Sequence, residues 1–154
     1  MFHLYLRIDY MDGQMVREMK LEKNDTIAIS GFNNSDETGA GIEHCNIVLP
    51  YNVMNQDNHD GTYGLTINKL LENTKHGMGK KYFTYDGLGG NNCQNFVMAI
   101  LQYNGLMEAN PQAKPFVFQD LSAMENTFAR QFSNKVTGLS ARLNVALLGK
   151  GLYK

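Results

Sequence analysis

The stretch that says most about the fold reads Gly-Gly-Asn-Asn-Cys-Gln-Asn-Phe-Val and spans residues 89–97. Its glycines and asparagines are typical of a loop. Apolar residues at helical spacing follow at once, at Phe96, Val97, Ile100 and Leu101. This periodicity predicts a half-buried helix from about residue 92 to 103, with Gly105 as a left-handed residue after its end. Cys93 then lies in the first turn of that helix.

A cysteine in a first helical turn lies close to backbone N–H groups that have no partner within the helix. These groups and the helix dipole favour a negative charge, and they can lower the pKa of a thiol from about 8.5 toward neutrality. A cysteine in a helix more often acts as a small buried hydrophobe. Here, however, amides flank it on both sides, at Asn91, Asn92, Gln94 and Asn95. Amides are a poor lining for an apolar slot and common donors in an oxyanion hole, so we predict that Cys93 is a nucleophile.

The composition limits the classes of protein to consider. With 154 residues, 43% of them hydrophobic, the chain can form one compact domain. The net charge of -1 predicts no nucleic-acid partner. Two cysteines without paired spacing, Cys45 and Cys93, argue against disulfides and thiolate zinc sites and favour a reducing compartment. We expect a cytoplasmic protein without signal peptide, membrane span, metal or cofactor.

The first half of the chain predicts a small antiparallel sheet. Apolar residues alternate with polar ones over residues 2–9, and Asp12-Gly13 is a hairpin signal. A second strand is predicted through residues 16–21 and a third over 26–29. We expect a loop over residues 30–41, a further strand over 42–49 ended by Pro50, and a polar, turn-rich loop over 52–64.

A second helix is predicted to begin after Thr66, a good N-cap, with Leu65 and Leu70 placed as a hydrophobic staple. Gly77 and Gly79 are expected to end it. An extended segment over residues 81–85 then leads to the Cys93 helix.

The residues after Pro111 and Pro115 predict a long amphipathic helix, bent at Gly138. Its apolar positions are three or four residues apart: Leu121, Met124, Phe128, Phe132, Val136, Leu139, Leu143 and Leu147. We therefore divide the chain into a core, residues 1–110, and a C-terminal helical extension, residues 111–154. The extension has three alternative roles: packing on its own core, self-association, or docking on a partner protein or membrane.

A cysteine nucleophile needs a base, and the chain has four histidines. His59 is best explained as a turn residue and His76 as a cation at a helix C-terminus. His44 adjoins Cys45 in a predicted strand, where neighbouring side chains point to opposite faces. His3 begins the first strand, and a strand histidine next to the first turn of a helix is an arrangement that activates cysteines.

The order of these features resembles the circularly permuted papain-like enzymes of the NlpC/P60 superfamily. The branch is the one that includes lecithin:retinol acyltransferase and its phospholipase/acyltransferase relatives, and viral or phage-associated members are the nearer match. The resemblance covers residues 2–106. It rests on four blocks: Phe2-His3-Leu4-Tyr5-Leu6, Leu21-Glu22-Lys23-Asn24, Leu65-Thr66-Ile67-Asn68-Lys69-Leu70-Leu71-Glu72-Asn73-Thr74 and Asn91-Asn92-Cys93-Gln94-Asn95-Phe96-Val97.

The resemblance implies an α+β fold in which the nucleophile helix packs on a small antiparallel sheet. It also implies Cys93 as the nucleophile and His3 as general base and later acid. The third polar residue of the family lies on the next strand, which points to Glu22, with Glu18 as a fallback. The lipid acyltransferases tend to have a second histidine where this chain has Glu22.

The implied function is a cysteine hydrolase of the peptidase or amidase type that acts through a thioester intermediate. Asn92 or Gln94 would help to hold the oxyanion. One alternative is a phospholipase or acyltransferase that acts on lipid esters, with the C-terminal helix touching a membrane. Another is a non-catalytic virion or interaction protein with a papain-like core. A viral protein of this kind would act in the host cytoplasm or in the virion.

Overall fold

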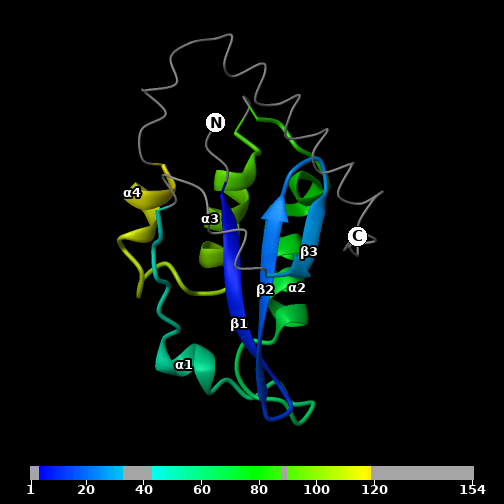
Figure 1. Ribbon diagram of the computed structural model, residues 1–154, viewed down its shortest axis with the longest axis vertical. Helices are drawn as coiled ribbons and strands as arrows, with labels where there is room; N and C mark the ends of the chain where they lie inside the picture. Colours follow the sequence, from blue (N-terminus) through cyan, green and yellow to red (C-terminus); the bar gives the residue numbers. More distant parts are fainter. Residues whose placement is uncertain (1–3, 33–42, 88–89, 119–154) are drawn as a thin grey trace.

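The computed structural model describes residues 4–32, 43–87 and 90–118. Three strands come first: β1 (Tyr5–Asp12), β2 (Met15–Lys23) and β3 (Ile27–Gly31). The helices follow: α1 (Tyr51–Met54), α2 (Ile67–Met78), the 3-10 helix η2 (Gly79–Phe83), α3 (Cys93–Tyr103) and α4 (Ala113–Val117). The strands form one antiparallel sheet in the order β1-β2-β3, and α2 and α3 lie behind it in the view of Figure 1. The α+β class and the small antiparallel sheet are as predicted.

The sheet confirms the predicted hairpin. Asp12 pairs with Met15, so a two-residue turn joins β1 to β2, and Gly13 in that turn has a positive φ of 63°. The register pairs Leu6 with Leu21, and therefore both apolar side chains face the same side of the sheet. The third strand lies slightly later than predicted, over Ile27–Gly31.

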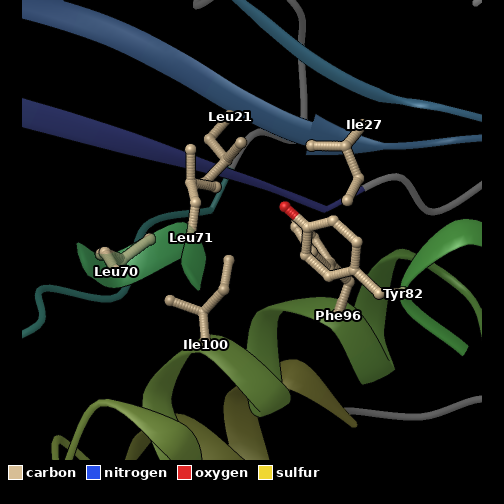
Figure 2. Packing of buried hydrophobic residues seen from close by; sticks show 7 residues of the cluster. All are labelled: Leu21, Ile27, Leu70, Leu71, Tyr82, Phe96 and Ile100. Atoms are coloured by element: carbon tan, nitrogen blue, oxygen red, sulfur yellow. The ribbon is translucent and has the colours of Figure 1, made fainter. Parts of the chain in front are cut away.

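The core fills the space between the sheet and the two long helices. Leu21 and Ile27 come from the sheet, and Phe96 and Ile100, four residues apart, come from one face of α3. Figure 2 shows the whole cluster: Leu21, Ile27, Leu70, Leu71, Tyr82, Phe96 and Ile100. This packing fixes α3, and with it Cys93, against the sheet.

Helix α2 begins as predicted, because the Thr66 side chain accepts a hydrogen bond from Lys69 N at 3.2 Å. Of the two glycines predicted to end it, Gly79 is the C-cap, with a φ of 56°, whereas Gly77 lies within the helix, which runs to Met78. Gly77 serves packing instead. A Cβ at this position would lie 2.3 Å from the Tyr103 ring of α3, so only glycine allows the two helices to approach this closely.

The predicted strand over residues 42–49 is wrong, since residues 43–50 have no regular structure. Side chains from far along the sequence bind this backbone in place of a neighbouring strand. Asn110 accepts from Val48 N at 2.7 Å and donates to Val48 O at 2.9 Å, and Gln112 donates to Asn46 O at 3.1 Å.

Two connecting segments also differ from the prediction. The loop over residues 52–64 contains the end of α1 and an isolated bridge between Asp57 and Tyr63. The segment expected to be extended before Cys93 is largely the 3-10 helix η2. Carbonyl groups at the end of η2 are bound by the Lys23 ammonium group, which favours a turn over an extended chain.

Of the predicted extension, residues 111–118 lie within the described residues, and their helix α4 packs on α3. Val117 lies in one cluster with Cys93, and Ala113 lies in another with Leu101. The long helix predicted from residue 121 falls outside the described residues. None of the described helices combines the length and apolar character needed to cross a lipid bilayer.

Candidate active site

Cys93 is the first residue of α3, as predicted. Asn92 is the N-cap, and its Oδ1 accepts from Gln94 N at 3.0 Å and from Asn95 N at 3.1 Å. In turn, the Asn95 Oδ1 accepts a hydrogen bond from Asn92 N at 3.4 Å, which completes a capping box. The position of the thiol at the positive end of the helix is therefore fixed by local hydrogen bonds.

The surroundings of the thiol are more apolar than the sequence indicated. Only 5% of Cys93 is exposed, and it shares a buried cluster with Leu4, Val97 and Val117. Our argument that flanking amides exclude an apolar slot is wrong, because neighbouring side chains on a helix point in different directions. The amides of residues 91, 92, 94 and 95 bind other partners, and the aliphatic side chains come from further away.

The two amides expected to bind an oxyanion have structural bonds in this conformation. Gln94 is buried and donates through Nε2 to Val117 O at 2.9 Å, which ties α3 to α4. Asn92 uses its Oδ1 for capping, while its Nδ2 lies 3.4 Å from Gly87 O, a long hydrogen bond. The oxyanion role stays a prediction, and Asn92 Nδ2 is the more available donor of the two.

Asn91 holds together the loop that precedes Cys93. Its Nδ2 donates to Lys81 O at 3.0 Å, to Thr84 O at 2.7 Å and to Thr84 Oγ1 at 2.8 Å. Its backbone forms an isolated bridge with Asp86. Both neighbours of Tyr85 are thus bonded to a residue two positions before the thiol.

Tyr85 is a member of the site that the sequence reasoning missed. It is half-buried, and burial raises the pKa of its phenol to about 12, with negative charge at Cys93 and Asp25 adding to the effect. Tyr85, Asp25 and Cys93 therefore lie close enough to interact electrostatically. The only signal in the sequence was the place of Tyr85 in the segment that leads to Cys93.

Lys23 is a second residue that was missed. It is completely buried, and its Nζ donates to Lys81 O at 2.6 Å and to Tyr82 O at 3.1 Å. Burial lowers the pKa of Lys23 to about 8. Next to it, Asn24 is also buried, and within the described part of the chain its Oδ1 has no hydrogen-bond partner. A strand-end lysine is usually exposed, so the pattern gave no reason to expect it here.

The predicted base lies outside the described residues, so the pairing of His3 with Cys93 stays a prediction. Leu4, the next residue, lies in the same buried cluster as Cys93, and this brings the start of β1 to the first turn of α3.

Glu22, predicted to orient the imidazole, is buried in β2 opposite Tyr5, with Oε2 3.5 Å from Lys20 Nζ. It alternates with Leu21 and Lys23, both of which face the helices, so its side chain starts from the other side of the sheet. The fallback, Glu18, forms an exposed ion pair with Arg7, with Nη2 2.7 Å from Oε1.

The other histidines lie away from Cys93 in the fold or are exposed. His44 is exposed in the irregular segment 43–50, and His59 is an exposed turn residue with a positive φ of 63°. His76 lies in the last turn of α2, as expected for a cation at a helix C-terminus. It lines a polar groove of about 800 Å³ that reaches Tyr103, at the opposite end of α3 from the thiol.

No match to this chain was found in a scan against protein-family models, in a search of curated proteins or in a search of solved structures. The chemistry of the site follows from its own residues. A thiol at the positive end of a capped helix can be a nucleophile, and a phenol that stays protonated at neutral pH can donate a hydrogen bond.

Proposed function

We propose that this chain is a cysteine-nucleophile hydrolase of the peptidase or amidase type, with a permuted papain-like core. One observation carries the proposal. Cys93 occupies the first position of a helix whose start is fixed by a capping box, and the buried cluster around the thiol contains Leu4, the residue after His3. Leu4 brings the start of β1 to the first turn of α3, and in this proposal the residue before it, His3, supplies the base.

The reaction would begin with transfer of the Cys93 proton to the His3 imidazole. The thiolate attacks the carbonyl carbon of a peptide or amide, and the oxygen takes up the negative charge. His3 then gives its proton to the leaving nitrogen as the C–N bond breaks, which leaves an acyl thioester on Cys93. Water, deprotonated by His3, attacks the thioester and releases the acid. Positioned acid–base help of this kind contributes about 100- to 10,000-fold.

Other polar groups have supporting roles in this proposal. The resemblance assigns the group that orients the imidazole and stabilises its charged form to Glu22. Its side chain starts from the face of the sheet opposite α3, so this role requires the imidazole to be reached around the end of β1. Asn24 is a second candidate for that role, because its amide oxygen is buried at the end of β2, and Leu4 lies just before Tyr5, at the same end of the sheet. In this proposal the phenol of Tyr85, whose pKa is raised to about 12, stays protonated at neutral pH and donates a hydrogen bond to the oxyanion or leaving group.

A lipid ester is the alternative substrate for the same chemistry. The aliphatic side chains of Leu4, Val97 and Val117 beside the thiol favour an apolar acyl group. A phospholipase or acyltransferase would use the C-terminal segment, residues 119–154, to reach a membrane.

The burial of Cys93 favours a candidate from a different class, a non-catalytic interaction protein. Exposed apolar side chains suit such a role: Met11, Val16, Tyr51 and Tyr63. In this case Cys93 is only a small core residue.

The two cysteines give an internal comparison that separates these functions. Cys45 is half-buried in an irregular segment and Cys93 is buried, so access alone predicts faster alkylation of Cys45. A hydrolase predicts the reverse: at neutral pH iodoacetamide should label Cys93 at least about tenfold faster, because reaction needs the thiolate. His3→Ala should remove that advantage. Faster labelling of Cys45 in the native protein would contradict the proposal. Peptide and acyl electrophiles offered in parallel would separate the amide from the lipid substrate.

A further inference from the structure

Lys23 is fully buried at the end of β2, which is rare for a lysine. An ammonium group leaves water only where other groups replace its hydration. Here the replacements are Lys81 O at 2.6 Å, Tyr82 O at 3.1 Å and Asn91 Oδ1 at 3.5 Å, together with the Phe96 ring at 5.5 Å. The lysine therefore connects the sheet to the segment that leads to Cys93.

Asn91 links Lys23 to the residues that precede the Cys93 helix. Its Oδ1 faces Lys23, while its Nδ2 is shared between Lys81 O and the two oxygens of Thr84. The backbones of Asn91 and Asp86 exchange two hydrogen bonds, Asp86 N to Asn91 O at 2.9 Å and Asn91 N to Asp86 O at 3.1 Å. These two bonds hold Asp86 beside Asn91, and Tyr85 directly precedes Asp86.

We infer that Lys23 and Asn91 are positioning residues of the Cys93 site, an inference that rests on the proposed hydrolase function. They touch no reacting atom. Lys23 holds the carbonyls of Lys81 and Tyr82, and Asn91 holds Thr84 and Asp86 next to the N-cap Asn92, so that the first helical turn keeps one geometry around the thiol.

The bonding pattern explains why these two residue types are used. An apolar side chain at position 23 would fill the volume but leave the carbonyls of Lys81 and Tyr82 without this donor. A hydrophobic residue at position 91 would leave the loop without its link to Lys81 and Thr84. The titratable groups around this network include Lys23 itself, Tyr85, Asp25 and Cys93.

The test measures the alkylation rate of Cys93 against pH in Asn91→Ala and Lys23→Met. Asn104→Ala is the matched control, because Asn104 is also a buried amide that donates to three oxygens, but it lies at the other end of α3. All three variants should melt at lower temperature. Only the first two should raise the apparent pKa of Cys93, by about one unit, with about a tenfold lower rate at neutral pH.

Thr84→Val provides a variant that should fold in any case, because Thr84 is exposed and only the Oγ1 acceptor at 2.8 Å is lost. It should slow Cys93 alkylation by about two- to threefold without lowering the melting temperature much. One outcome is that native Cys93 reacts faster than Cys45 while its alkylation rate against pH is unchanged in every folded variant at positions 23, 84 and 91. That result would make the positioning role wrong and leave the hydrolase proposal standing. If native Cys93 has no advantage over Cys45, both fail.

Discussion

The two ends of α3 use the same side chain for different purposes. At the C-terminal end, Asn104 donates to Leu70 O, Thr74 Oγ1 and Ile100 O, and Tyr103 packs against Gly77. These contacts join two helices. At the N-terminal end, Asn91 also donates to three oxygens, and its Oδ1 lies 3.5 Å from the buried ammonium group of Lys23. Burying a charged group is costly. The two ends therefore differ in what their amides contact: a lysine ammonium group at Asn91, and neutral groups at Asn104.

The largest expected effect at the N-terminal end of α3 is the loss of turnover when the Cys93 thiol is removed. If hydrolysis proceeds through Cys93, Cys93→Ala should lower the turnover of a peptide, amide or ester substrate by at least about 1,000-fold. The free energy of unfolding should change little, since alanine leaves only a small cavity. Parallel measurements of turnover and of thermal unfolding check both parts, and Cys45→Ala is the control that should keep its activity. Turnover that survives Cys93→Ala would end the catalytic account.

The free energy of unfolding should depend on pH because the ammonium group of Lys23 is buried near the N-terminal end of α3. Because the folded-state pKa of Lys23 is about 8 and the usual value is 10.5, the unfolded chain binds more protons between these values. The free energy of unfolding should therefore rise with pH across this range, by at most about 1.4 kcal/mol per unit. Denaturant titrations of the native chain and of Lys23→Met isolate the effect, since the variant should lack this rise. Identical pH curves would show that Lys23 is not buried as a charge.

At higher pH, the phenol of Tyr85 should make the free energy of unfolding fall with pH, whereas Lys23 makes it rise. Its folded-state pKa, about 12, lies above the usual 10, so the folded chain keeps a proton that the unfolded chain loses. Stability should therefore fall above about pH 10 in the native chain, and Tyr85→Phe should remove that part of the fall.

At the C-terminal end, Gly77→Ala should destabilise the fold without touching the thiol chemistry. The new Cβ would lie 2.3 Å from the Tyr103 ring, and overpacking of this kind costs about 1–3 kcal/mol. Alanine recovers up to about 1 kcal/mol through helix propensity, so we expect a net loss of up to about 2 kcal/mol. Thermal unfolding gives the loss, and the Cys93 alkylation rate should stay at its native value. A large fall in that rate would mean that the two ends are coupled.

The two N-caps provide the smallest and most closely matched comparison. Thr66→Ala in α2 and Asn92→Ala in α3 should each lower the free energy of unfolding by about 1 kcal/mol. Only Asn92→Ala should also slow Cys93 alkylation, because it loosens the turn that carries the thiol. Equal effects of both variants on alkylation would assign the change to general loosening of the fold.

The sequence predicted well those elements that local signals determine. Alternation predicted the first strand of the hairpin, the Thr66 cap marked the start of α2, and the apolar spacing after residue 92 marked the start of α3. The prediction from sequence failed where residues far along the chain determine the local backbone structure. The backbone of residues 46–48 is bound by Asn110 and Gln112, more than sixty residues away, so no local pattern could exclude a strand there.

The same limit applies to the candidate site. Cys93 could be predicted, because its place at a helix start is a local property. Its burial by Leu4 and Val117 could not, since these residues come from opposite ends of the described chain. Nor could the burial of Lys23, which depends on carbonyl groups 58 and 59 residues further on. Spacing predicted the place of Cys93 at a helix start, and only the fold identified the surroundings of its thiol.

The central claim is that the start of α3 keeps the Cys93 thiol ionised at neutral pH. The most direct measurement is the ultraviolet absorbance of the thiolate as a function of pH in a Cys45→Ala variant, which leaves one titrating thiol. The account predicts a midpoint well below the usual value of about 8.5. A midpoint at or above that value would contradict it and would make Cys93 a buried core residue.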